Sequence, residues 1–160
     1  MLRMLTFMLT ALAATNCWAN GLTPGDLMRL QDIYGKASTF ARELGSVARA
    51  RAPSPAGQCM QALVNTTSRF LGEMDKLYDL VAIDVEMIDQ RDEAVVLRYL
   101  QTEIKVNPNG IAINRRQIDA IMGQCGSDGV VAAKCQELLR LQDDGASFIE
   151  AVSRKLGLSP

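Results

Sequence analysis

The sequence predicts an all-α protein, folded as an antiparallel helical bundle with one long central helix and short C-terminal helices. Apolar residues recur at alternating spacings of three and four over most of the chain, which is the period of an amphipathic helix. The alternation of apolar and polar residues that is typical of strands is confined to Ile111-Ala112-Ile113. With 160 residues, 48% of them hydrophobic, the chain is long enough to bury a single core.

Residues 1–19 are expected to be a cleaved secretory signal. A single charge, Arg3, precedes an apolar run over residues 4–14, and the small residues Cys17 and Ala19 precede the favoured cut. A cut after Ala13 is the alternative. The apolar run is too short to span a bilayer, which takes roughly 20 residues. Cleavage leaves one helical domain, residues 20–160. We expect this domain to be periplasmic or secreted.

The first predicted helix covers residues 24–50. Thr23 can cap its first turn, Pro24 suits the first helical position, and apolar residues follow at helical spacing from Leu27 to Ala48. The proline-containing segment 51–57 then separates this helix from the next one.

Residues 58–106 form the predicted central helix. Residues 80–104 are apolar on two faces, as expected for a helix that lies between neighbours. An unbroken helix would be roughly 70 Å long at 1.5 Å per residue. The polar residues 89–93 offer a place for a kink or a tight turn, and both alternatives stay open. Asn107-Pro108-Asn109-Gly110 is expected to end the helix.

The remaining residues are expected to form short helices that cover the other side of residues 80–106. Asn114 can cap a helix that ends at Met122, and Ser127-Asp128 can cap the next one. Asp143-Asp144-Gly145 is expected to interrupt that helix. A last helix, 146–156, is closed by Gly157.

Composition excludes several classes of function. The chain has no histidine, which removes Ser-His and Cys-His catalytic pairs, histidine-ligated metals and c-type haem attachment. Its 17 basic and 18 acidic residues nearly balance, which argues against a nucleic acid partner. We expect no cofactor, because apolar stripes of this width can stabilise a bundle on their own.

Three cysteines remain after cleavage at Ala19, and in an oxidising compartment at least one disulfide is expected. The favoured pair is Cys125–Cys135, which brackets a Gly-Ser-Asp-Gly turn. Cys59 is either free or the alternative partner of one of the two. The odd thiol would be a buried small side chain or a reactive cysteine that links two chains.

Two sets of charged residues are candidate binding sites. The first lines one face of a continuous helix at spacings of 4, 7 and 7, and would form a docking surface for a basic partner or a solvated face: Asp75, Asp79, Glu86 and Glu93. The second is the pair Arg115 and Arg116 at a predicted helix N-terminus, where cations oppose the helix dipole. A neighbouring carboxylate or a bound small anion would balance these two arginines.

These observations favour a non-catalytic exported protein that acts by protein–protein contact, such as an envelope accessory, an inhibitor or an immunity-type factor. The protein partner is not indicated by any motif, and a homo-oligomer or a disulfide-linked dimer is an alternative assembly. A small all-helical enzyme or small-anion binder that uses arginine and glutamate is the second hypothesis. A thiol-redox or disulfide-linked factor is the third.

Overall fold

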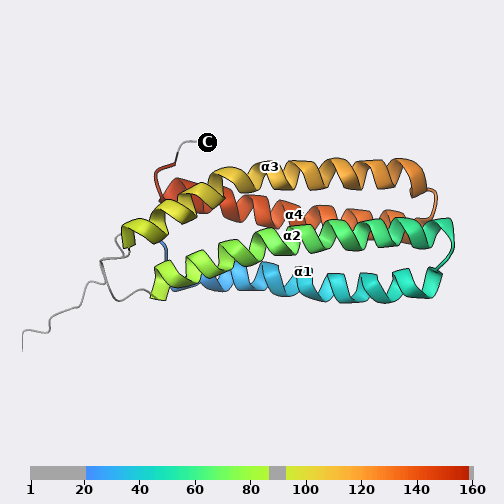
Figure 1. Ribbon diagram of the computed structural model, residues 1–160, viewed down its shortest axis with the longest axis horizontal. Coiled ribbons are helices and arrows are strands. Elements are labelled where there is room, and N and C mark those ends of the chain that lie inside the picture. Colours follow the sequence, from blue (N-terminus) through green and yellow to red (C-terminus); the bar gives the residue numbers. More distant parts are fainter. Residues whose placement is uncertain (1–20, 87–92, 159–160) are drawn as a thin grey trace, which may run out of the picture.

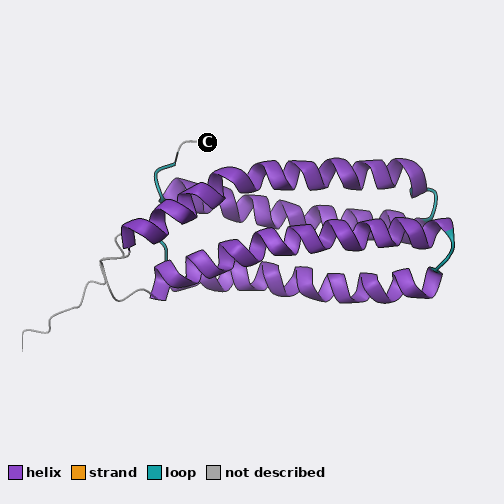
Figure 2. Cartoon of the chain, viewed as in Figure 1, coloured by secondary structure: helices purple, strands orange, loops and turns teal. Residues whose placement is uncertain are grey.

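The computed structural model describes residues 21–86 and 93–158, and these residues form a bundle of four α-helices (Figure 1). The helices are α1 (Pro24–Arg51), α2 (Pro55–Glu86), α3 (Glu93–Cys125) and α4 (Gly129–Lys155). No strand occurs in these two described stretches (Figure 2). The predicted all-α bundle is therefore confirmed, whereas the predicted signal and its cleavage sites lie outside the described residues.

The start of α1 follows from its sequence. The amide of Asp26 donates to the Thr23 hydroxyl at 3.4 Å, and the Thr23 amide donates to the Asp26 carboxylate at 2.8 Å. This reciprocal capping satisfies two amides that a helix end otherwise leaves unpaired. The predicted helix 24–50 agrees with α1 to within one residue.

All four helices contribute to one apolar core. Consecutive helices run in opposite directions, and α1 packs beside α2 and α3 beside α4 (Figure 1). Phe40 of α1, Phe70 of α2, Leu100 of α3 and Phe148 of α4 are among its buried side chains. Each helix thus presents one apolar face inward, as its periodicity predicts.

Residues 58–106 do not form one helix. The disulfide between Cys59 and Cys125 joins the first turns of α2 to the end of α3. The chain must therefore double back between these two helices, which lie side by side (Figure 1). The predicted kink or turn at 89–93 falls almost entirely on residues 87–92, outside the described residues.

The prediction of short C-terminal helices is wrong. The helices α3 and α4 are long and continue through the breaks predicted at residues 107–110 and 143–145. In α3 the buried Asn107 donates its side-chain amide to the Glu103 carbonyl at 3.2 Å, within its own helix. Pro108 lies inside α3, and the helix changes direction along its length (Figure 1). In α4 a Cβ on Gly145 would come 3.1 Å from the Phe70 ring, so glycine permits close packing there. Tertiary packing overrides the local breaking tendency at these sites.

Ion pairs connect α1 with the α4 region at both ends of the bundle. Lys155 Nζ lies 2.7 Å from the Asp26 carboxylate, and Arg51 Nη1 lies 2.6 Å from Asp128. Burial raises the pKa of Asp26, but hydrogen bonds from Lys155 and Thr23 outweigh it, so that the pKa is below its ordinary value. Asp128 also caps α4 by accepting from two amides of its first turn.

Candidate binding surfaces

The disulfide connectivity differs from the favoured one. Cys125 is bonded to Cys59, the alternative partner, and Cys135 is free and buried. The favoured pair Cys125–Cys135 is wrong because Cys125 ends α3 against the start of α2. Cys135, in contrast, lies in the second turn of α4 and its side chain packs in the core.

Cys135 is not suited to linking two chains. Its side chain is 0% exposed, and desolvation by burial raises the pKa of its thiol to about 11. A thiol in such surroundings carries almost no thiolate at neutral pH, and the thiolate is the reacting species. Cys135 therefore behaves as a small apolar side chain, and the described cysteines offer no accessible thiol for a redox reaction or an intermolecular bridge.

The predicted acidic surface is not one stripe. Asp75, Asp79 and Glu86 are exposed on α2, whereas Glu93 begins α3 and its side chain lies outside the described part. The spacing argument required a continuous helix, which the chain does not form. Asp75 and, more weakly, Asp79 act on Tyr34 of α1, whose pKa they raise together with burial. Asp75 and Asp79 thus lie near the α1–α2 seam.

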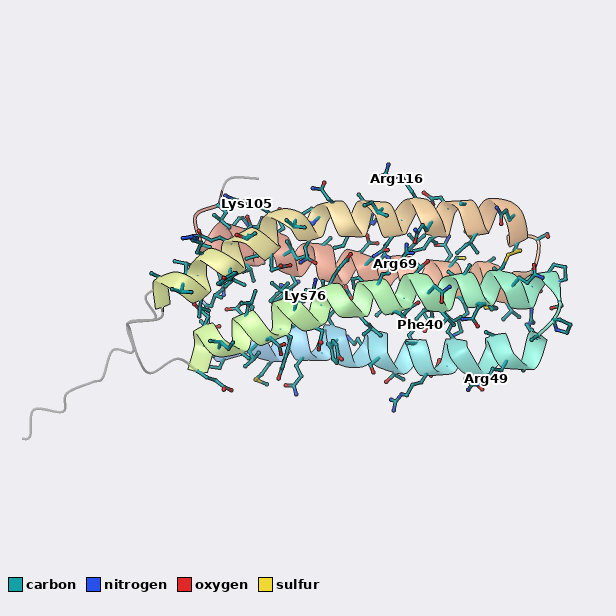
Figure 3. The ribbon with its side chains drawn as sticks, viewed as in Figure 1. Phe40, Arg49, Arg69, Lys76, Lys105 and Arg116 are labelled. Atoms are coloured by element: carbon teal, nitrogen blue, oxygen red, sulfur yellow. A yellow bond between two sulfur atoms is a disulfide. The ribbon has the colours of Figure 1, made fainter. Side chains whose placement is uncertain are left out.

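Arg115 and Arg116 lie in the interior of α3, far from a helix N-terminus. Arg115 forms an ion pair with Asp143 of α4, while its Nε is buried and has no hydrogen-bond partner among the described residues. Arg116 donates to the Ala112 carbonyl at 3.4 Å and projects away from the bundle (Figure 3). The structure therefore does not bring the two guanidinium groups together at one site.

An exposed apolar stripe on α3 was missed by the sequence analysis. In the described part of the chain, four of the seven exposed large hydrophobic side chains lie on this helix, between 47% and 61% exposed: Val95, Tyr99, Val106 and Ile113. Their spacings of 4, 7 and 7 place them within roughly 40° of arc, since a helix turns about 100° per residue. We call these four residues the α3 stripe.

The surroundings of the α3 stripe are mainly basic. Arg98, Lys105 and Arg116 are exposed along one side of it, and the half-buried Glu103 lies on the other. Both apolar columns of residues 80–104 were expected to pack against neighbouring helices. The second column was the available signal, because a helix at the corner of a four-helix bundle buries one column and leaves the other to solvent.

Gln142 and Glu73 are polar side chains that lack full solvation. Gln142 of α4 is 0% exposed, and neither atom of its amide has a hydrogen-bond partner within the described residues. Glu73 of α2 is half-buried against α3, where Asn114 Nδ2 donates to it at 3.4 Å. Desolvation raises the pKa of Glu73 above its ordinary value, and the charge of Lys76 opposes this.

Comparison with protein-family models, with curated proteins and with solved structures finds no match. The class that geometry defines is an all-α four-helix bundle with an internal disulfide. None of its four helices has an apolar stretch long enough to cross a bilayer. Within residues 21–86 and 93–158, no three acidic or cysteine side chains converge as metal ligands.

Proposed function

We propose that the chain is a non-catalytic, exported protein that acts by binding another protein through the α3 stripe. The exposed apolar column is the observation that supports this function most directly, because a row of large apolar side chains along one helix face is typical of contacts with a partner helix. Burying the exposed half of four such side chains contributes about 1 kcal/mol each by transfer, which is enough to anchor a protein contact. The Cys59–Cys125 bridge fits an oxidising compartment.

The partner is an amphipathic helix with an acidic flank. The stripe follows the seven-residue spacing of a coiled-coil seam, with the exposed Thr102 and Asn109 at the intervening positions. Arg98 and Arg116 border the seam and complement negative charge on the partner. If two copies of this chain packed through antiparallel α3 helices, the arginines of one copy would lie opposite those of the other and repel them. A helix of a different protein therefore suits the surface better than a second copy.

The test is site-specific photo-crosslinking in the native envelope. A benzoylphenylalanine placed at Tyr99, Val106 or Ile113 is expected to give the same adduct, which mass spectrometry identifies. The same probe at Arg42, exposed on α1, is expected to give none. Adducts at Arg42 equal to those at the three stripe positions would contradict the proposal.

Binding of the identified partner, purified, then measures the contribution of the stripe. Val106→Asp is expected to weaken binding at least 10-fold, since it places a carboxylate in the apolar seam and opposite an acidic flank. Met28→Asp, on α1, is the matched control because Met28 is similarly exposed, at 68%. Arg98→Glu is expected to weaken binding and reduce its salt dependence. An equal loss of affinity in the Met28→Asp variant would contradict this proposal. A self-dimer that Val106→Asp dissociates would contradict it too.

A further inference from the structure

A groove of about 730 Å³ runs between α3 and α4 and includes none of the four residues of the α3 stripe. Its volume lies within the roughly 300–1,000 Å³ that is usual for small-molecule sites. The walls are mainly apolar and come from both helices and the segment after α4: Ile104, Pro108, Ile111, Ala112, Ala146, Ile149 and Leu158. Along α3 the groove extends from Ile104 to Arg115, which is roughly 16 Å at 1.5 Å per residue.

The shape of the groove coincides with the proline in α3. Pro108 has no amide hydrogen to donate to the carbonyl of Ile104, and its ring occupies the space of that hydrogen bond. The helix changes direction in this region (Figure 1). Ile104 and Ile111 flank the proline on the groove wall and face Ile149 of α4. These three isoleucines are only 3–4% exposed, so they close the bottom of the groove. The apolar surface open to a ligand comes from Pro108, Ala112, Ala146 and Leu158, which we call the apolar floor.

The charged residues of the groove are predominantly basic. Lys105, Arg115 and Arg154 line it together with one acidic residue, Glu150. Glu150 pairs with Arg154 at 3.0 Å, and Arg115 pairs with Asp143. Lys105 is exposed (Figure 3) and has no ion pair or hydrogen bond with another residue in the described part. It is therefore the groove cation whose charge is left for a ligand.

We propose that the α3–α4 groove binds an amphipathic anion, a linear alkyl carboxylate whose chain lies on the apolar floor and whose head group is bound by Lys105. A neutral apolar molecule would cover the floor but leave the lysine without a counter-charge. A small hydrophilic anion would reach the lysine but bury none of the floor. The combination of an elongated apolar wall and one unpaired ammonium selects a ligand that has both parts.

The test uses decanoate as the probe and the purified chain with its disulfide intact. Calorimetric titration below the micelle concentration is expected to show one site, and 1-decanol is expected to bind at least 10-fold more weakly because it lacks the charge. Lys105→Met is expected to reduce decanoate affinity about 10-fold and leave decanol unchanged. Lys76→Met is the matched control, since Lys76 is an exposed lysine on α2 that does not line the groove.

A second variant tests the location of the site. Ala112 is exposed on the groove wall, so Ala112→Trp fills the groove without entering the core, and circular dichroism checks that the fold is kept. This variant is expected to abolish decanoate binding while photo-crosslinking at the α3 stripe continues. Decanoate binding that is equal in Ala112→Trp and wild type would overturn the proposal. Binding to anionic phospholipid vesicles without binding to free decanoate would overturn it too, and indicate a membrane surface instead.

Discussion

Removal of the Cys59–Cys125 disulfide provides a quantitative test of how the bundle is held together. The bridge joins residues 66 positions apart, so it restricts about two fifths of the unfolded chain. The chain-entropy relation for a loop of this length gives roughly 15 cal/mol/K, or about 4 kcal/mol at 25 °C. That amount is a large part of the roughly 5–15 kcal/mol that separates folded and unfolded domains of this size. We expect the double variant Cys59→Ala, Cys125→Ala to lose about this free energy of unfolding.

Urea denaturation followed by far-UV circular dichroism measures this loss. A reducing agent is expected to destabilise the wild type by a similar amount and to leave the double variant unchanged, which separates the bridge from the packing of the sulfur atoms. The slope of the transition should rise in the variant, because an unbridged chain exposes more surface on unfolding. A double variant within 1 kcal/mol of the wild type would refute the reasoning. A tryptic map that links Cys125 to Cys135 would refute the connectivity itself.

Four further changes have defined outcomes. Gln142→Met is expected to raise the free energy of unfolding by about 1–3 kcal/mol in urea titrations, since it removes a buried amide without partners among the described residues. Glu73→Gln is expected to be more stable than wild type at pH 7. Burial raises the pKa of Glu73 in the folded protein, so the wild type loses stability as the pH rises through this folded-state pKa. The difference between the two proteins should vanish below pH 4.5, where the carboxyl group is neutral in the folded and the unfolded chain. Cys135 is expected to resist iodoacetamide at pH 8 in the native protein and to react in urea, as mass spectrometry would show. Pro108→Ala is expected to raise stability by up to about 3 kcal/mol and to weaken decanoate binding, measured by the same calorimetry.

The fold class and the first helix were predictable because they depend on local patterns. The apolar spacing of three and four requires a helical face, and Thr23 and Pro24 mark a start that the structure reproduces. The predicted ends at residues 107–110 and 143–145 were wrong because breaking tendency is a weak local preference. The Asn107 amide finds its acceptor inside the helix, and Gly145 is favoured by the Phe70 ring on another helix. A contact between two helices, such as that of Gly145 with Phe70, cannot be read from the local sequence.

The binding surfaces were less predictable than the fold because each depends on which helices become neighbours. The pair Arg115 and Arg116 is adjacent in sequence, yet one arginine faces α4 and the other faces solvent. The Cys59–Cys125 pairing joins two helix ends that only the doubling back of the chain brings together. Val95 and Tyr99 were recognised as apolar positions beside a second column, and both columns were expected to be buried. Their exposure could be assigned only once the number of packed neighbours was known.

Both proposed surfaces lie on α3, and this follows from how the bundle distributes its constraints. Ion pairs hold α1 to the α4 region at both ends, and the disulfide fixes the end of α3 to α2. The middle of α3 instead carries Pro108, which is unfavourable by about 3 kcal/mol in an ordinary helix interior. Natural chains tend to break local rules where function requires it. The groove gives a physical reason for this proline, because a straight, fully hydrogen-bonded α3 could pack closely along α4 and would leave less room for a ligand.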